Sequence, residues 1–242
     1  MKRFYKEVSI SPSPLVAEGA SRSDAEGGWV LLLDDKPIKT PARATLTLPS
    51  EALAEAIAEE WRGQSETIDP QSMPLTRLSF AAIDTVAQNR ARVAEQVLRF
   101  GRSDLVCYRA EAPPELVARQ TAAWDTLLDW LAEMHGARLS VGAGISFIEQ
   151  PADALLALEQ AVQRHGDFAL AGLHAAATIT GSLVLALALL SARLSAAEAF
   201  ALAMLDEDFQ AEKWGRDMEA EALRARLLAD LTAAERFLRL LE

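Results

Sequence analysis

Residues 29–63 read WVLLLDDKPIKTPARATLTLPSEALAEAIAEEWRG and combine the signals of a small sheet with those of a helix. Residues 29–34 form an apolar run that predicts a strand, and the Asp-Asp-Lys-Pro sequence that ends it is typical of a turn. Residues 38–41 and 45–48 continue as a meander, with Pro41 at an edge or a bend. The N-terminal part of the chain is therefore predicted to be β-rich.

The same stretch ends in one amphipathic helix. Ser50 is the predicted N-cap, because its hydroxyl can accept a hydrogen bond from an N–H group of the first turn. Apolar side chains recur every four residues at Leu53, Ile57 and Trp61, which gives the helix one buried face. Gly63 is the expected stop. A helix packed on a small sheet follows from this pattern.

The rest of the chain is dominated by helical periodicity. A polar stretch with two prolines, residues 64–74, is the best candidate for a linker. Beyond it, apolar stripes predict several helices, including a long one opened by two prolines at 113–114 and closed by Gly136. The predicted fold class is α+β, with a small β-rich α+β domain at residues 1–64 followed by a larger all-helical domain at residues 65–242.

Composition limits the classes of function. Half of the 242 residues are apolar and about a quarter are charged, which is typical of a globular protein and argues against disorder. A net charge of −11 and a pI near 4.9 repel a phosphate backbone, so we expect no nucleic-acid partner. The single cysteine, Cys107, excludes an internal disulfide and any multi-cysteine zinc site. Because its start has neither an apolar signal core nor an Arg-rich transit segment, the protein is expected to act in the reducing cytoplasm.

Residues 168–192 carry no formal charge, and a segment of 25 residues could span a bilayer. However, small and polar residues break its middle, among them Thr178, Gly181 and Ser182, and neither flank carries a basic cluster or an aromatic belt. We therefore expect a buried helix without stable membrane insertion. Peripheral membrane binding through this segment is the minor alternative.

Residues 205–221, LDEDFQAEKWGRDMEAE, hold seven carboxylates against one lysine and one arginine. A capping box formed by Ser195 and Glu198 predicts where the helix that carries them begins. On such a helix Glu207 shares one stripe with four apolar residues, namely Phe200, Met204, Ala211 and Trp214. An unpaired charge is very costly to bury, so Glu207 either faces a partner or is neutralised inside the fold.

Three interpretations of the acidic segment stay open at this point: a solvated face, an active site and a docking surface. The three histidines lie on separate segments, and no hydrolase, metalloprotease or phosphate-binding motif occurs. Neighbouring carboxylates on a helix diverge by about 100°, whereas catalytic acids must converge. An enzyme that uses the acidic cluster with a divalent metal is the alternative, and it requires at least three acids around one pocket.

Short motifs, in order along almost the whole chain, resemble those of the ATP synthase assembly chaperones, the "ATP-twelve" proteins. In the first half they are Gly28-Trp29, Leu33-Asp34, Pro37 to Pro41, Leu48-Pro49-Ser50, Leu53-Ala54, Ile57-Ala58, Glu60-Trp61, Gln64, Met73-Pro74-Leu75-Thr76 and Ala82-Ile83-Asp84. Further along they are Asp104-Leu105, Tyr108-Arg109, Gln120, Trp124-Asp125, Gly181-Ser182-Leu183-Val184, Phe209-Gln210 and Trp214-Gly215. Each motif is short, but together they are specific.

The resemblance implies a non-enzymatic chaperone with a small α+β N-terminal domain and a helical C-terminal domain. Members of that family bind the unassembled α subunit of the catalytic head of ATP synthase and shield its β-facing interface until the hexamer forms. No cofactor and no metal are implied. The protein would be a monomer when free, in the bacterial cytoplasm or, for eukaryotic relatives, in the mitochondrial matrix.

The resemblance also implies a site. In that family an acidic position in the segment corresponding to residues 205–210 is functionally important, and we assign it first to Glu207. The expected partner-binding residues are Glu207, Asp206, Asp208, Phe209, Gln210 and Trp214. Their helical spacing predicts that Phe209 and Trp214 pack inward. Relatives are expected to have a histidine-containing stretch after Gly215, where this chain has residues 217–221, so no role for such a histidine is carried over.

Overall fold

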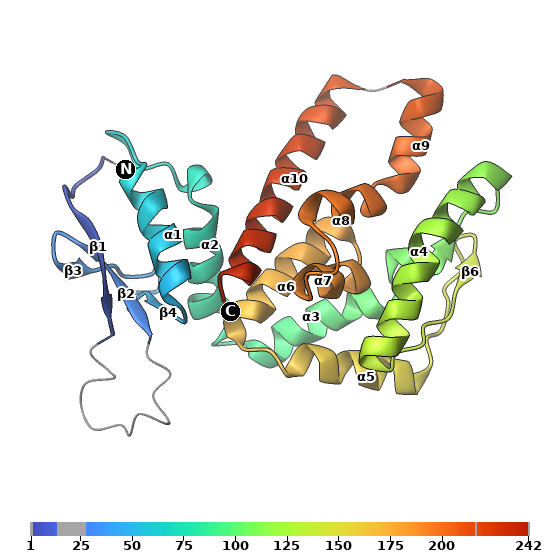
Figure 1. Cartoon of the computed structure of the whole chain (residues 1–242), viewed down its shortest axis with the longest axis horizontal. Helices are drawn as coiled ribbons and strands as arrows, with labels where there is room; N and C mark the ends of the chain where they lie inside the picture. Colours follow the sequence, from blue (N-terminus) through green and yellow to red (C-terminus); the bar gives the residue numbers. More distant parts are fainter. Residues whose placement is uncertain (1, 14–27, 216, 242) are drawn as a thin grey trace. The chain divides into compact units, whose positions relative to one another are not determined.

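The computed structural model describes residues 2–13, 28–215 and 217–241. The chain forms two compact units. Unit 1 comprises residues 1–90, 167–171 and 236–242, and unit 2 comprises residues 91–166 and 172–235. The fold class is α+β, as predicted: an antiparallel sheet lies in the N-terminal part, and helices make up most of the rest (Figure 1). The domain boundary between residues 64 and 65 stays a prediction.

The sheet of unit 1 is built around β2 (Trp29–Leu33). Strand β1 (Val8–Pro12) pairs with it antiparallel along its whole length, while β3 (Lys36–Pro37) and β4 (Thr47–Leu48) pair with its two ends. Asp34 and Asp35 both have positive φ, 46° and 62°, as a tight two-residue hairpin turn requires. The predicted strand and turn are confirmed, whereas β1 was not predicted.

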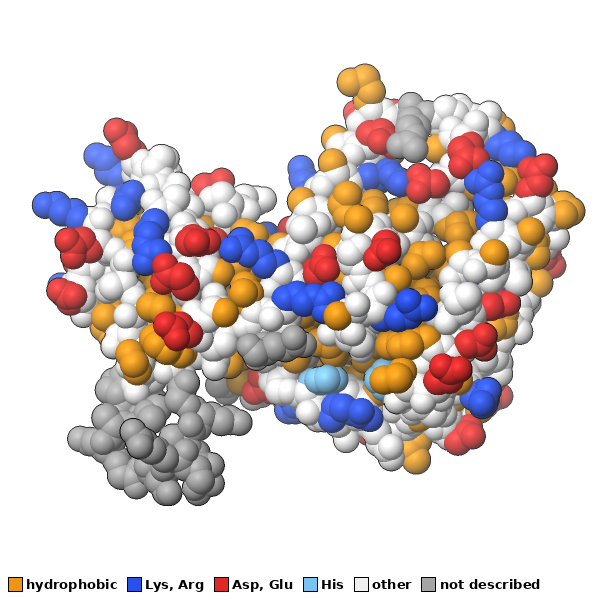
Figure 2. All heavy atoms as spheres, in the orientation of Figure 1, with side chains coloured by type: hydrophobic (Ala, Val, Ile, Leu, Met, Phe, Trp, Pro, Cys, Tyr) orange, Lys and Arg blue, Asp and Glu red, His pale blue; other side chains and the backbone are white. Residues whose placement is uncertain are grey.

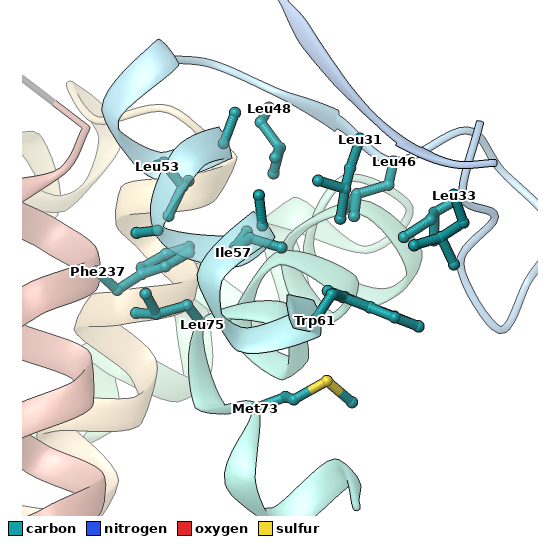
Figure 3. Packing of buried hydrophobic residues seen from close by; sticks show 14 of the residues in the cluster. Leu31, Leu33, Leu46, Leu48, Leu53, Ile57, Trp61, Met73, Leu75 and Phe237 are labelled. Atoms are coloured by element: carbon teal, nitrogen blue, oxygen red, sulfur yellow. The ribbon is translucent and has the colours of Figure 1, made fainter. Parts of the chain in front are cut away.

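Helix α1 (Glu51–Arg62) covers this sheet. The hydroxyl of Ser50 accepts a hydrogen bond from the N–H of Leu53 at 3.1 Å, so the predicted N-cap is confirmed. The predicted apolar face is buried as well. It packs with side chains from the sheet, the segment after α1 and the end of the last helix, namely Leu31, Leu33, Leu46, Leu48, Met73, Leu75 and Phe237 (Figure 3).

The predicted linker at residues 64–74 is instead an ordered loop of unit 1. The buried amide of Gln64 donates to the hydroxyl of Ser72 at 3.0 Å and accepts from the N–H of Asp69 at 2.7 Å. This loop contains the short helix η2 (Pro70–Ser72), and it leads into α2 (Pro74–Ala81) and the π-helical η3 (Ala82–Val86). Polar side chains that suggested a linker form hydrogen bonds within this loop instead.

A carboxylate from α1 holds the start of α2. Glu60 accepts hydrogen bonds from the N–H groups of Leu75 and Thr76 at 2.7 and 2.8 Å, and from the Thr76 hydroxyl at 2.7 Å. Helix starts leave such N–H groups without intrahelical partners. Burial raises the pKa of Glu60 above its ordinary value, although these hydrogen bonds oppose the shift.

Unit 2 is helical apart from one short strand pair. Its elements, some shared with unit 1, are α3 (Arg90–Arg102), η4 (Leu105–Cys107), α4 (Pro114–His135), α5 (Ala152–Gln163), α6 (Asp167–Thr180), α7 (Leu183–Leu190), α8 (Ala196–Ala203), α9 (Leu205–Trp214) and α10 (Met218–Arg239). Strands β5 (Tyr108–Arg109) and β6 (Gly142–Ala143) pair in parallel. The predicted long helix that ends at Gly136 is α4, and Gly136 has the left-handed conformation expected of a helix stop.

The uncharged segment 168–192 forms two helices where the sequence predicted one. Gly181, with φ 68° and ψ 15°, ends α6, and Ser182 caps α7. Every residue of α7 from Leu183 to Leu189 is buried, so burial of this segment is confirmed. Within the described residues, no helix has both the length and the apolar character needed to cross a membrane.

The start of α7 is held by a buried carboxylate from a distant part of the chain. Asp104 accepts hydrogen bonds from the N–H groups of Leu183 and Val184 at 2.8 and 3.1 Å, and from that of Val106 at 3.3 Å. The residue is fully buried. Loss of contact with water raises the pKa of Asp104 to about 6, although the hydrogen bonds donated to it act in the opposite direction.

This pKa predicts a pH dependence of stability. Between about pH 4 and pH 6, Asp104 is largely protonated in the folded protein and largely ionised in the unfolded chain. The folded state therefore binds more protons, and the free energy of unfolding falls as pH rises. The loss amounts to about 3 kcal/mol, at about 1.4 kcal/mol per pKa unit. Urea unfolding measures this loss. The free energy of unfolding of wild type minus that of Asp104→Asn should decrease by this amount across the range. Two parallel pH profiles would contradict the prediction.

Candidate functional site

The acidic segment does not continue the helix that precedes it. The capping box at Ser195 and Glu198 is present and begins α8, as predicted. The helix then breaks at Met204, whose φ of −99° and ψ of 17° separate α8 from α9. The single long helix predicted from Ser195 is therefore wrong, and the acidic residues lie on a short helix of their own.

Helix α4 positions both sides of this break. The indole N–H of Trp124 donates to the carbonyl of Leu202 at 3.1 Å, at the end of α8. One turn earlier on α4, the buried amide of Gln120 donates to Asp206 at 2.7 Å and also accepts from the backbone N–H of Ala110. Asp206 is thus directed at α4, and its carboxylate holds the start of α9 in place.

Phe209 anchors the middle of α9. It is the one residue of this helix that is buried, at 3 % exposure, which confirms that it packs inward. Two cations lie near its ring, Arg119 at 5.1 Å and Lys213 at 4.9 Å from the centroid. Arg119 also pairs with Glu212 at 2.8 Å. Phe209 therefore cannot contact a partner unless α9 moves.

Asp208 points to the other side, toward α10. Its carboxylate accepts from the guanidinium of Arg224 at 2.7 Å, and Glu221 lies 3.8 Å from the same guanidinium. The Arg224 guanidinium also lies 5.6 Å from the ring of Phe200 on α8. This network joins α8, α9 and α10, so Asp208 acts within the fold.

Glu207, Gln210 and Trp214 are the predicted site residues that face solvent. Trp214 is 79 % exposed, so the expectation that it packs inward is wrong. The side chain of Glu207 forms no hydrogen bond or ion pair with the residues that the structure describes. The stripe predicted from helical spacing is present in part: Met204, Ala211 and Trp214 line one groove with Glu207. Phe200, the fourth member, is instead buried in α8.

We call this hollow the α9–α10 groove. It has a volume of about 550 Å³ and lies between two helices that run in opposite directions (Figure 1). It is lined by Met204, Glu207, Gln210, Ala211, Trp214, Gly215, Asp217, Ala220, Glu221, Leu223, Arg224 and Leu227. Hydrophobic side chains between the two helices are accessible from outside and are bordered by charged ones, as Figure 2 shows.

The turn at the end of the groove depends on Gly215. Its φ of 90° and ψ of 171° lie in a region that is essentially restricted to glycine. This backbone conformation ends α9 immediately after Trp214 and lets the chain reverse toward α10. Arg216, the next residue, lies outside the described residues. Gly215 therefore helps to leave the indole of Trp214 at the mouth of the groove.

The three consecutive acids diverge. Asp206 points at α4, Asp208 at α10 and Glu207 into solvent along the groove. Within the described residues, no group of three or more His, Cys, Asp or Glu side chains is placed to hold a metal ion. The convergent acids that a metal-dependent enzyme would require are therefore not formed here. Burial also raises the pKa of Cys107 to about 12, which makes its thiol a poor nucleophile.

Several residues that build the site were not predicted. Gln120 and Trp124 were named among the motifs of the family resemblance but were not assigned to the site, yet their polar atoms hold α8 and α9. Leu223 and Leu227, which were not among the predicted site residues, also line the groove, with Leu223 54 % exposed.

Comparison with known proteins agrees with this architecture. Residues 2–132 match the family of the ATP12 chaperone protein. The crystal structure of Atp12 from Paracoccus denitrificans is 43 % identical, with a TM-score of 0.91, over 100 % of this chain and 98 % of that one. A variant of it with one aspartate replaced by lysine matches equally well. Atu1473 from Agrobacterium tumefaciens, described as a candidate chaperone, is also 43 % identical, with a TM-score of 0.91, over 100 % of this chain and 86 % of that chain.

The two aromatic residues of α9 should respond differently to truncation. Phe209→Ala removes a buried ring and is expected to lower the free energy of unfolding by about 3 kcal/mol. Trp214→Ala changes an exposed side chain and should stay within about 0.5 kcal/mol of wild type. Urea unfolding followed by circular dichroism measures both. Equal losses in the two variants would show that Trp214 packs in solution.

Proposed function

This chain belongs to the ATP12 chaperone family, the assembly chaperones of ATP synthase, and from that premise we propose that its client is the unassembled α subunit of the catalytic head. In this proposal the protein covers the β-facing interface of that subunit and leaves when the hexamer forms. It acts without catalysis, as a monomer before it meets its client, in the cytoplasm of a bacterium.

The observation that carries the proposal is the exposed apolar surface at the α9–α10 groove. Trp214, Met218 and Leu223 are 79 %, 87 % and 54 % exposed and follow one another around the turn between the two helices. Large apolar side chains gathered in this way are a sign of a protein-binding surface. Tryptophan in particular is common where binding energy is concentrated.

The charges around this surface fit a chaperone that must release its client. Apolar contacts supply affinity, while carboxylates at the rim select the partner and set its register. Such charges raise the association rate more than the affinity. Glu207 is exposed at the edge of the groove, so a partner cation can reach it without disturbing the fold. Binding of this kind is strong enough to mask an interface and weak enough to be displaced.

The six expected partner-binding residues then divide into two roles. Glu207, Gln210 and Trp214 would contact the client, because their side chains are exposed on the groove. Asp206, Asp208 and Phe209 would act indirectly, because their contacts hold α9 against α4 and α10.

A charge reversal tests the proposal. Glu207→Lys should fold normally and reduce recovery of the α subunit at least tenfold when the tagged protein is purified from cells. Glu133→Lys, at an exposed carboxylate of α4, makes the same change in net charge away from the groove and should recover the α subunit as wild type does. Circular dichroism confirms that both variants are folded.

The outcomes separate the two parts of the proposal. If the wild-type protein does not recover the α subunit, the client is wrong. If wild type and Glu207→Lys recover it equally, the client stands and the site on α9 is wrong.

A further inference from the structure

We propose that the α9–α10 groove receives an amphipathic helix of the client that carries a lysine or arginine beside its apolar anchors. This inference rests on the proposed function and adds to it the kind of element that is bound. It follows from the shape, the backbone chemistry and the charge of the groove, which we take in turn.

The groove presents two apolar stripes that face each other. The first stripe comprises Ala211 and Trp214, which are spaced by three residues on one side of α9, and Met204, which directly precedes that helix. On α10, Leu223 and Leu227 are spaced by four and form the second stripe. A third helix can bury one face of its own against both stripes, as helices do when they pack.

The length of the groove fits a few turns of helix. The span from residue 204 to residue 214 is ten residues, which corresponds to about 15 Å at 1.5 Å per residue. Anchors at i, i+4 and i+7 of a docked helix cover about 10 Å by the same measure, so three of them fit. The volume of about 550 Å³ accommodates such side chains while the rest of the docked helix stays outside.

The backbone of the groove favours a helix over a strand as the occupant. Docking by strand addition requires a sheet edge with free N–H and C=O groups. Both walls here are helices, whose interior N–H and C=O groups are already bonded to each other. The binding energy must come from side chains, and an amphipathic helix brings its own backbone hydrogen bonds with it.

The charge of the groove selects a basic helix. Among the described residues that line the groove, Arg224 is the one cation, and it is paired with Asp208 at 2.7 Å and with Glu221 at 3.8 Å. Asp217 accepts the backbone N–H of Ala220 at 3.0 Å and remains exposed. Glu207 is exposed as well, on the opposite wall. A lysine or arginine on the docked helix lies between these two carboxylates, and an acidic helix is repelled.

The first experiment locates the bound segment. A photo-crosslinking benzoylphenylalanine replaces Trp214, and the tagged protein is irradiated with the purified α subunit. Mass spectrometry then identifies the crosslinked residues. We expect them in one helical segment of the α subunit with a lysine or arginine within one turn. Crosslinks to strands, or to helices that lack a basic residue, would overturn the inference.

The second experiment tests the groove with a matched pair of variants. Leu223→Glu places a charge inside the groove, and Leu156→Glu places the same charge at a leucine of α5 with nearly the same exposure, 54 % against 55 %. The Kd for the α subunit should rise at least tenfold in Leu223→Glu and stay within twofold of wild type in Leu156→Glu. Raising the salt concentration should also weaken wild type more than Glu207→Gln.

Failure of this inference is distinct from failure of the proposed function. If wild type binds the α subunit and the two leucine variants bind it equally well, the client stands and the groove is not its docking site. If wild type does not bind the α subunit at all, the proposed function itself fails.

Discussion

The helical unit depends on the hydrogen bonds that Asp104 accepts at the start of α7. That helix is buried on every side, so water cannot reach the N–H groups of its first turn. The carboxylate of Asp104 bonds two of them from 79 residues earlier in the chain. Helices α4 and α8 pack against α7, and α4 in turn holds α9 through Gln120 and Phe209. The groove is therefore positioned by a chain of contacts that begins in the core.

Distant carboxylates are used in the same way elsewhere. Glu60 bonds the first N–H groups of α2, and Glu235 bonds the N–H of Ala196 at the start of α8 at 2.8 Å. Some of the carboxylates that make this chain acidic therefore serve to hold the starts of helices. Several residues that carried the family resemblance, among them Glu60, Asp104 and Gln120, make hydrogen bonds that hold the fold together. The resemblance therefore reflects the fold more than the proposed docking surface.

Local signals in the sequence were sufficient for much of the fold and less so for the site. The strand at Trp29, the cap at Ser50 and the capping box at Ser195 depend on neighbouring residues and could be predicted. Periodicity also placed Met204, Ala211 and Trp214 beside Glu207, although it wrongly added Phe200, which lies beyond the break at Met204. It could not show whether another part of the chain covers that face, so Trp214 was placed inside and is exposed. Strand β1 was missed because its pairing with β2 is a long-range contact.

Helix α9 buries a single side chain, Phe209, and otherwise holds to α4 through exposed or partly exposed polar pairs. Exposed ion pairs contribute little, so Phe209 supplies most of the free energy that keeps this helix docked. Local opening of α9 is therefore much less costly than unfolding the unit built around α7. Helix α9 can therefore open or shift while the helices beneath it stay intact. If the client binds at α9 as we propose, a competing subunit would need to open only this helix to displace the chaperone.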